Sequence, residues 1–325
     1  MQLSLVVPCY NEAANVAALY RLCRDTFAPA GVEYELIFVN DGSRDDTWAA
    51  LLAVQETAAC RVQLIDFSRN FGKEAAMLAG LQRTTGTYVA LMDADLQQPP
   101  AAVLEMVRFL DANPDYDCVA AYPDKRREGR FMSHCKKRFY RVINAACDIH
   151  FRPDASDFRT FRQPVVQAIL SLGEYHRFSK GIFSYVGFPT YYMPYTVQER
   201  HAGKTSWSFG KLCRYAFEGI VSFSTFPLQL ATVAGAITAF LSLLYMLVVI
   251  IQKLAFGIAI PGYATIVVLI LLIGGLQMMM LGIIGAYIAR IYIQSKHRPV
   301  YIAREYRPGT VETDRLEETE KNPGN

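Results

Sequence analysis

The segment 93–100 (DADLQQPP) places two carboxylates one residue apart, directly after the apolar run 88–92. In an extended chain, residues two apart face the same side, so Asp93 and Asp95 point toward one place. Carboxylate oxygens are the ligands that Mg²⁺ and Mn²⁺ prefer, and such a metal also binds phosphate oxygens. Two helix-capping aspartates are the plain alternative. The position of the pair at the end of a buried strand favours metal binding.

Polar sequences also follow the other apolar runs. The runs lie at 3–7, 35–39, 62–67, 88–92 and 118–121 and alternate with helical patterns. This alternation predicts an α/β fold in which helices cover both faces of a mostly parallel sheet. Ligands bind beyond the carboxyl ends of the strands in such sheets. We therefore expect PCYNE, NDGSRDD, SRNFGK and DADLQQ, which follow four of the runs, to converge on one site.

Asp41 follows the second apolar run. An acidic residue at this position accepts hydrogen bonds from a ribose or base, although an Asp–Gly turn is an alternative.

Two other nucleotide-binding patterns are absent. No G-x-G-x-x-G follows the first apolar run, which argues against a dinucleotide-binding dehydrogenase. The sequence AGKTS (202–206) lacks the upstream glycine of a P-loop, because residue 198 is Gln198.

Two uncharged apolar runs, 228–251 and 263–289, each exceed the roughly 20 residues that span a bilayer. Two buried helices of a soluble core are the alternative, but such helices rarely run so long without a charge. Basic residues flank the pair on its outer side, and the loop between the runs carries only Lys253, so we expect both ends to be cytoplasmic. The N-terminus lacks the positive segment of a signal peptide. Residues 209–223 have the amphipathic pattern of an interfacial helix.

Composition excludes several other classes. The seven cysteines are scattered and form no C-x-x-C pair, which indicates reduced cytosolic thiols rather than a zinc site or a disulfide framework. The formal net charge is only +3, so no nucleic-acid partner is expected. A basic cluster at 125–141 includes Arg127 and is either a solvated helix face or a surface that faces phosphates.

The ordered set VVPCYNE, VNDGSRDDT, RNFGKEAAMLAGL, DADLQQPP, SDFRTF and R-x-x-G, followed by two apolar spans, resembles the family 2 glycosyltransferases. Within them it resembles the polyprenyl-phosphate glycosyltransferases, which include bactoprenol glucosyltransferases and dolichyl-phosphate mannose synthases. The resemblance covers the chain up to about residue 306. It implies a GT-A fold with a mixed, mostly parallel sheet. It also implies metal-dependent, inverting transfer of a sugar from a nucleoside diphosphate to a lipid phosphate.

The resemblance, carried over by position, also implies roles for individual residues. Nine would bind the nucleotide sugar: Pro8, Tyr10, Glu12, Asp41, Arg69, Gly72, Lys73, Asp93 and Gln97. The first four would hold the base and ribose, and the next three would lie near the nucleotide. Asp93 and Asp95 would bind the Mg²⁺ or Mn²⁺ that bridges the diphosphate, and Gln97 would line the sugar pocket.

On the acceptor side, the resemblance implies that Asp157 of SDFR is the base. The acceptor is a phosphate monoester with a second pKa near 6, so it is mostly deprotonated at neutral pH and needs little help from a base. An orienting role for Asp157 is therefore equally compatible with the chemistry. A simple ion pair with Arg159 or Arg162 is the structural alternative.

The acceptor phosphate would be bound by Arg200, Lys204, Ser206 and Arg127. Here the chain departs from the family pattern R-x-x-G-x-S/T-K. The expected lysine position holds Ser206, and Lys204 stands two residues earlier. Both side chains face the same side of an extended segment. Either one is thus a candidate contact to the phosphate.

These observations predict a cytoplasmic GT-A catalytic domain over 1–207 and a juxtamembrane amphipathic helix over 208–225. A two-helix membrane hairpin over 226–293, with helices at about 227–252 and 263–290, precedes a cytoplasmic tail over 294–325. Small residues in the second span permit close helix packing, and we expect a homo-oligomer.

The predicted reaction is inverting transfer of glucose from UDP-glucose to undecaprenyl phosphate at the cytoplasmic face of the membrane. The SDFR form and the sequence YVGF (185–188) are most similar to the bactoprenol glucosyltransferase branch. GDP-mannose, UDP-aminoarabinose or another UDP-sugar are alternative donors. A non-catalytic nucleotide-sugar sensor or scaffold is the alternative from another class. A processive polysaccharide synthase would carry Q-x-x-R-W and more membrane spans.

Overall fold

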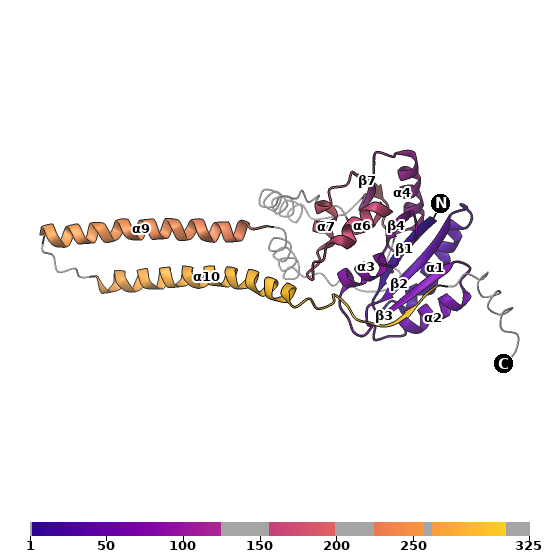
Figure 1. Ribbon diagram of the computed structural model, residues 1–325, viewed down its shortest axis with the longest axis horizontal. Coiled ribbons are helices and arrows are strands. Elements are labelled where there is room, and N and C mark those ends of the chain that lie inside the picture. Colours follow the sequence, from indigo (N-terminus) through magenta and orange to yellow (C-terminus); the bar gives the residue numbers. More distant parts are fainter. Residues whose placement is uncertain (1, 125–155, 199–223, 257–261, 310–325) are drawn as a thin grey trace. The chain divides into compact units, whose positions relative to one another are not determined.

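The computed structural model describes residues 2–124, 156–198, 224–256 and 262–309 (Figure 1). These residues belong to two units. The first is an α/β unit that contains 2–124, 156–198 and 299–309, and the second is helical and contains 224–256 and 262–298. The predicted boundary at 207/208 lies outside the described residues, as does the predicted juxtamembrane helix except for residues 224–225.

The α/β unit is built on an eight-stranded mixed sheet in the order β7-β5-β6-β4-β1-β2-β3-β8. The strands are β1 (Gln2–Cys9), β2 (Glu33–Asn40), β3 (Arg61–Phe67), β4 (Tyr88–Leu91), β5 (Cys118–Pro123), β6 (Arg159–Arg162), β7 (Thr190–Tyr195) and β8 (Ala303–Arg307). The central strands β4, β1, β2 and β3 are parallel. Strand β6 runs antiparallel between β4 and β5, and β8 runs antiparallel to β3. The predicted α/β class with a mostly parallel sheet is confirmed.

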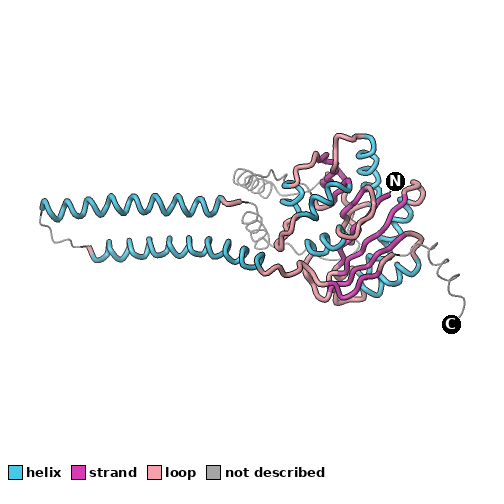
Figure 2. The backbone as a smooth tube through the Cα atoms, viewed as in Figure 1, coloured by secondary structure: helices cyan, strands magenta, loops and turns pink. Residues whose placement is uncertain are grey.

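Helices cover both faces of this sheet (Figure 2). They are α1 (Ala13–Phe27), α2 (Thr47–Thr57), α3 (Lys73–Leu81), α4 (Pro100–Ala112), α6 (Gln163–Ser171) and α7 (Ser179–Tyr185). Helix α1 packs with α2 and α4 over one face, where Leu5 and Val7 of β1 join the main core. Helix α3 packs against β1 and β2 with α6 beside it. A Cβ at Gly80 of α3 would lie 2.2 Å from Cγ1 of Val6, so only glycine permits this close helix–strand approach.

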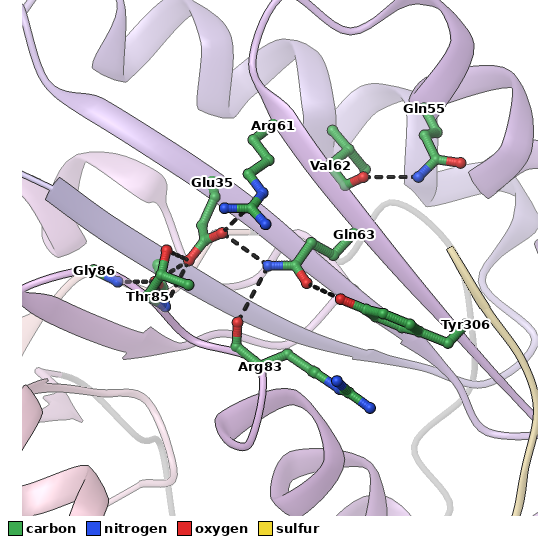
Figure 3. A network of polar contacts seen from close by, with 10 residues as sticks. Glu35, Gln55, Arg61, Val62, Gln63, Arg83, Thr85, Gly86 and Tyr306 are labelled. Atoms are coloured by element: carbon green, nitrogen blue, oxygen red, sulfur yellow. Dashed lines mark hydrogen bonds and ion pairs between the residues drawn. The ribbon is translucent and has the colours of Figure 1, made fainter. Parts of the chain in front are cut away.

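A buried polar network joins the N-terminal halves of the strands (Figure 3). The Glu35 carboxylate accepts hydrogen bonds from Ser4 Oγ at 2.5 Å, Gln63 Nε2 at 2.8 Å, and the backbone N and Oγ1 of Thr85 at 2.9 and 2.8 Å. Gln63 Oε1 accepts from the hydroxyl of Tyr306 at 2.7 Å. We call these residues the Glu35 network. It joins β1, β2, β3 and β8 at the end of the sheet away from the predicted site.

The strand–helix alternation up to residue 121 was predicted within a few residues, whereas the strands β6, β7 and β8 were not. Strand β6 has only four residues, two of them arginines, and it is inserted between β4 and β5. Strand β8 lies in the segment predicted as a C-terminal tail, yet it forms one edge of the sheet beside β3. The chain therefore returns to the α/β unit after the two apolar helices.

The helical unit consists of α9 (Phe226–Phe256) and α10 (Tyr263–Ser295). By length and composition, the segments Phe226–Gln252 and Val268–Ser295 could each cross a membrane, and the protein buries none of either segment's most apolar window. The hydroxyl of Tyr287 in α10 donates to the backbone oxygen of Ser224, just before α9, at 2.6 Å. Both predicted apolar spans are therefore helices.

Candidate active site

A pocket of about 310 Å³ opens at the carboxyl ends of the central strands. Eight residues predicted for the site line it: Pro8, Tyr10, Glu12, Asp41, Gly72, Lys73, Asp93 and Asp95. Cys9, Asn70 and Ala94 complete the lining. The ends of β1, β2 and β4 and the start of α3 supply these residues, as expected for a ligand site in a sheet with parallel central strands. Arg69, Gln97 and Asp157 are not among the lining residues.

The acidic pair follows β4 in a tight turn. Leu96 has a φ of 63°, which turns the chain back on itself after Asp95. The side chain of Gln98 then holds Asp93 at two points, because its Oε1 accepts from the Asp93 backbone N at 2.8 Å and its Nε2 donates to Oδ2 at 3.0 Å. Oδ1 of Asp95 accepts from the backbone N of Gln97 at 3.2 Å. Gln98 was not predicted as a site residue. The second glutamine of DADLQQ was the only sequence signal for it.

Lys73 bridges the donor and acceptor sides of the predicted site. Its Nζ lies 2.5 Å from Oδ1 of Asp93 and 3.4 Å from Oδ2 of Asp157. Burial lowers the pKa of Lys73, but the two carboxylates outweigh it and raise the pKa above its usual value. Burial likewise raises the pKa of Asp157, but the positive charges of Lys73 and Lys180 dominate and lower it. Both groups are therefore ionised at neutral pH.

Asp157 does not form the alternative ion pair with Arg159 or Arg162. The Nε of Arg159 donates to the backbone oxygen of Ser156 at 3.1 Å, and its guanidinium lies over the ring of Phe183. The Nε of Arg162 lies 3.9 Å from Asp117 Oδ1. Asp157 is paired instead with Lys73.

Asp41 is buried beneath the pocket and holds the loop after β3. Its carboxylate accepts from the backbone N of Phe71 at 2.6 Å and of Gly72 at 2.9 Å. Burial raises the pKa of Asp41, and these hydrogen bonds oppose part of that shift. Gly72 has a φ of 98°, a conformation that favours glycine, directly before α3. The side chain predicted to bind a ribose therefore also fixes the pocket wall.

The loops after β1 and β2 are also tied together. The backbone N of Asn11 donates to Ser43 Oγ at 3.0 Å, and its Oδ1 accepts from the backbone N of Arg44 at 2.9 Å. Asn11 has a φ of 56°. This turn presents the neighbouring Tyr10 at the pocket with 42% of its surface exposed. An exposed aromatic ring at a polar pocket is suited to stacking on a flat ring system.

One carboxyl beside the site was missed by sequence reasoning. Glu74, the second residue of α3, accepts hydrogen bonds from the backbone N of Ser179 at 3.0 Å and from its Oγ. Burial raises the pKa of Glu74 to about 7, with a further contribution from the negative charge of Asp157. The contact joins α3 to α7 across more than a hundred residues of sequence, so no local pattern could have found it.

The donor set for a metal consists of the acidic pair. In the described ranges, no group of three or more His, Cys, Asp or Glu side chains is arranged to hold a metal ion. Mg²⁺ commonly takes only one or two carboxylates and completes its shell with water and substrate phosphates. Asp93 and Asp95, both half-buried and both lining the pocket, fit that pattern. The predicted phosphate-binding residues Arg127, Arg200, Lys204 and Ser206 lie outside the described residues.

Comparison with known proteins identifies the family. A model of the glycosyl transferase family 2 domain matches residues 4–170, which include most of β1, all of β2 to β6 and the whole pocket lining. The chain therefore belongs to glycosyl transferase family 2, and it is a glycosyltransferase with a GT-A-like fold.

Two relatives match nearly the full length. The bactoprenol glucosyl transferase of Shigella phage SfV is 38% identical over 304 residues, which cover 94% of this chain and 98% of the relative. The prophage bactoprenol glucosyl transferase homolog of Escherichia coli (strain K12) is 37% identical over 304 residues, with coverages of 94% and 99%. Among solved structures, mannosyl-3-phosphoglycerate synthase from Rubrobacter xylanophilus matches with a TM-score of 0.46 and 15% identity, covering 68% of this chain and 72% of that one.

Proposed function

We propose that this glycosyltransferase transfers glucose from UDP-glucose to a polyprenyl phosphate, with undecaprenyl phosphate as the expected acceptor. One observation carries the proposal: Lys73 joins Asp93, from the end of β4, to Asp157, which precedes β6. Lys73, which lines the pocket, thus contacts one carboxylate of the proposed donor side and one of the proposed acceptor side. The near full-length similarity to bactoprenol glucosyl transferases supports the lipid acceptor and the glucose donor.

The nucleotide diphosphate would lie over the carboxyl ends of β1, β2 and β4. Tyr10 would stack on the base, and Asp41 would fix the wall on which the ribose lies. Asp93 and Asp95 would hold Mg²⁺ or Mn²⁺, which supplies positive charge to the leaving diphosphate when bound. The N-terminus of α3, at Lys73, adds the positive end of a helix dipole to the same region.

The acceptor phosphate needs orientation more than deprotonation. An ionised phosphate oxygen forms the new bond to the anomeric carbon from the face opposite the diphosphate, while the bond from that carbon to the diphosphate oxygen breaks and UDP leaves. No proton must be removed in this step, because the acceptor is mostly a dianion at neutral pH. We therefore assign Asp157 the role of positioning Lys73 and the acceptor, not that of an obligatory base.

The two apolar helices α9 and α10 would anchor the enzyme in the membrane that holds its lipid acceptor. We propose that both ends of the chain lie on the cytoplasmic side, in keeping with the basic residues outside the two spans. Arg200, Lys204, Ser206 and Arg127 would bind the acceptor phosphate at this surface. A homo-oligomer is proposed from the small residues of α10 alone.

The test uses membranes that contain the full-length protein, undecaprenyl phosphate and a panel of labelled nucleotide sugars, each with and without EDTA. We expect label to enter the lipid fraction from UDP-glucose and to be lost with the chelator. Lipid-linked label from GDP-mannose or UDP-aminoarabinose instead would correct the donor and keep the acceptor. Binding of a nucleotide sugar without transfer from any donor would favour a sensor or scaffold and contradict the proposal.

A further inference from the structure

The chain that leaves α10 returns to the α/β unit and packs beneath the loop that forms one wall of the pocket. We define the C-terminal strap as residues 299–307, which contain β8, and the pocket loop as residues 68–72, which follow β3. Asn70 and Gly72 of the pocket loop line the pocket. We propose that the strap is a positioning element for the nucleotide site, with Arg304 as its central positioning residue; this inference rests on the proposed function.

The strap holds the start of the pocket loop through its backbone. The backbone N of Ser68 donates to the backbone oxygen of Ile302 at 3.0 Å. One guanidinium nitrogen of Arg304 donates to the backbone oxygen of Ser68 at 3.2 Å. Both backbone groups of Ser68 are therefore bonded to the strap, and the loop begins from a point that the strap fixes.

Arg304 also neutralises a buried carboxylate. Its second terminal nitrogen lies 3.4 Å from Oδ2 of Asp66, whose side chain is 5% exposed. Oδ1 of Asp66 accepts from Nδ2 of Asn40 at 2.7 Å, and Oδ1 of Asn40 accepts from the backbone N of Ser43 at 3.3 Å. An ion pair on the strap is thus linked, through two buried side chains, to the loop after β2. Losing Arg304 would leave a buried carboxylate without its charge partner, which is strongly unfavourable.

Aromatic contacts make a second connection. The ring of Tyr301 stacks on Phe67 with centroids 4.8 Å apart, and its hydroxyl donates to Gln82 Oε1 at 2.6 Å. Phe67 packs edge-on against Phe71 of the pocket loop, with centroids 5.7 Å apart. The backbone N of Phe71 is one of the two donors to Asp41. The stack therefore supports the point at which Asp41 holds the loop.

The loops after β2 and β3 cannot move independently of each other. A Cβ at Gly42 would lie 2.3 Å from the backbone carbon of Arg69 and 2.5 Å from the backbone N of Asn70. The two loops therefore touch backbone to backbone at this glycine, whose φ is 61°. A displacement of the pocket loop would pass directly to Asp41 and Gly42, so the strap supports two of the pocket's walls.

The experiment compares two arginines of β8 in the full-length protein in detergent. Arg304→Ala removes both contacts to the β3 side, whereas the matched control Arg307→Ala removes only a contact to Glu305 on the same strand. The affinity for UDP in the presence of MnCl₂ is measured by isothermal titration. Hydrogen exchange is followed in peptides covering residues 66–72, which reports on the pocket loop without any ligand.

We expect Arg304→Ala to weaken UDP binding about tenfold, the size of one charge-assisted hydrogen bond. Exchange at the amides of Ser68, Phe71 and Gly72 should become faster. Arg307→Ala should leave both readouts within about twofold of the wild type. Adding Asp66→Asn to Arg304→Ala should recover part of the affinity, because the unpaired buried charge is then gone.

Equal effects of Arg304→Ala and Arg307→Ala would overturn the inference, since the strap would then act only through the general stability of the sheet. An unchanged affinity for UDP in Arg304→Ala would also overturn the inference. A wild-type protein that binds no nucleotide overturns the proposed function itself. In that case the exchange rates alone decide whether the strap holds the pocket loop, and unchanged rates in Arg304→Ala reject it.

Discussion

Carboxylates at the two ends of the parallel strands have opposite surroundings. At the N-terminal end, Glu35 is 4% exposed, and its oxygens accept hydrogen bonds from Ser4, Gln63 and Thr85. At the carboxyl end, Asp93 and Asp157 share Lys73, and both Asp93 and Lys73 line an open pocket. A buried carboxylate with its full set of donors stabilises the fold. A partly exposed pair joined by one flexible ammonium can exchange that partner for a ligand.

The difference follows from what surrounds each end. Residues from three strands and the turn at 83–86 meet at Glu35, so donors are available from every side (Figure 3). At the other end Asp41 ties the loop after β2 to the loop after β3, and Gln98 holds Asp93 in the loop after β4. Residues of these three loops line the pocket. The carboxyl end therefore keeps space for a ligand, while the N-terminal end is closed.

The largest effect is expected at the open end. Asp95→Asn should lower the turnover of sugar transfer by about 100-fold or more, because it removes charge from the proposed metal and diphosphate site. The thermal midpoint should stay within about 2 °C of the wild type, since asparagine keeps an oxygen that can accept from the backbone N of Gln97. Asp25→Asn on α1, an exposed carboxylate paired with its neighbour Arg24, is the matched control. Full turnover in Asp95→Asn would contradict the claim that the carboxylates at the carboxyl end of the strands serve the reaction.

At the closed end the effect should fall on stability. Glu35→Gln replaces the carboxylate oxygen that accepts from Ser4 and Thr85 with an amide NH₂ group. The buried donors of Ser4 and Thr85 would then face another donor instead of an acceptor. The free energy of unfolding should fall by about 3 kcal/mol, which lowers the melting midpoint by roughly 6–12 °C for a domain of this size. The Michaelis constant for the donor should not change. A raised Michaelis constant with an unchanged midpoint would mean that the two ends are not separate in function.

A third effect concerns pH and the contact between α3 and α7. The pKa of Glu74 is about 7 in the folded protein, above its ordinary value of 4.5. The folded state thus binds more protons than the unfolded state between these values, and stability falls as pH rises through that window. Glu74→Gln should remove this decline. The thermal midpoint of the variant minus that of the wild type should therefore increase between pH 5 and pH 8. A constant difference across this range would show that Glu74 is ionised throughout.

The smallest effect is expected where the Glu35 network reaches β8. Tyr306→Phe removes the hydrogen bond to Gln63 Oε1 and leaves the aromatic ring, over which Arg83 lies, in place. We expect a loss of about 1 kcal/mol, or roughly 2–4 °C in the midpoint, and no change in UDP affinity. Weaker UDP binding in this variant would show that the strap transmits changes along its whole length and not only at Arg304.

The sequence predicted the ends of β1, β2 and β4 and the residues that follow them, because buried parallel strands read as continuous apolar runs that stop at polar residues. Eight of the predicted residues line the pocket for this reason. Asp41 shows the limit of such reasoning. Its position was predicted from its neighbours in the sequence, but its hydrogen bonds to Phe71 and Gly72 come from a different strand–helix connection.

Apart from Gln98, the missed site residue and the missed edge strand depend on contacts between distant segments. Ser179 meets Glu74, and β8 meets β3, only after the sheet has assembled. Strand β8 also follows two long apolar helices, so its sequence AREYR reads as part of a polar tail. A strand of five residues, three of them charged, has no periodic signal that would separate it from a loop.

The position of β8 in the chain has a consequence for biosynthesis. A ribosome makes residues 226–295 before residues 303–307, so β3 remains an open edge of the sheet until both apolar helices have been synthesised. An open edge exposes unpaired backbone groups that invite association with other chains. A nascent chain interrupted before the helices would lack both apolar helices and the last strand of its sheet. Completion of the catalytic unit is in this way delayed until the segments that would tether it exist.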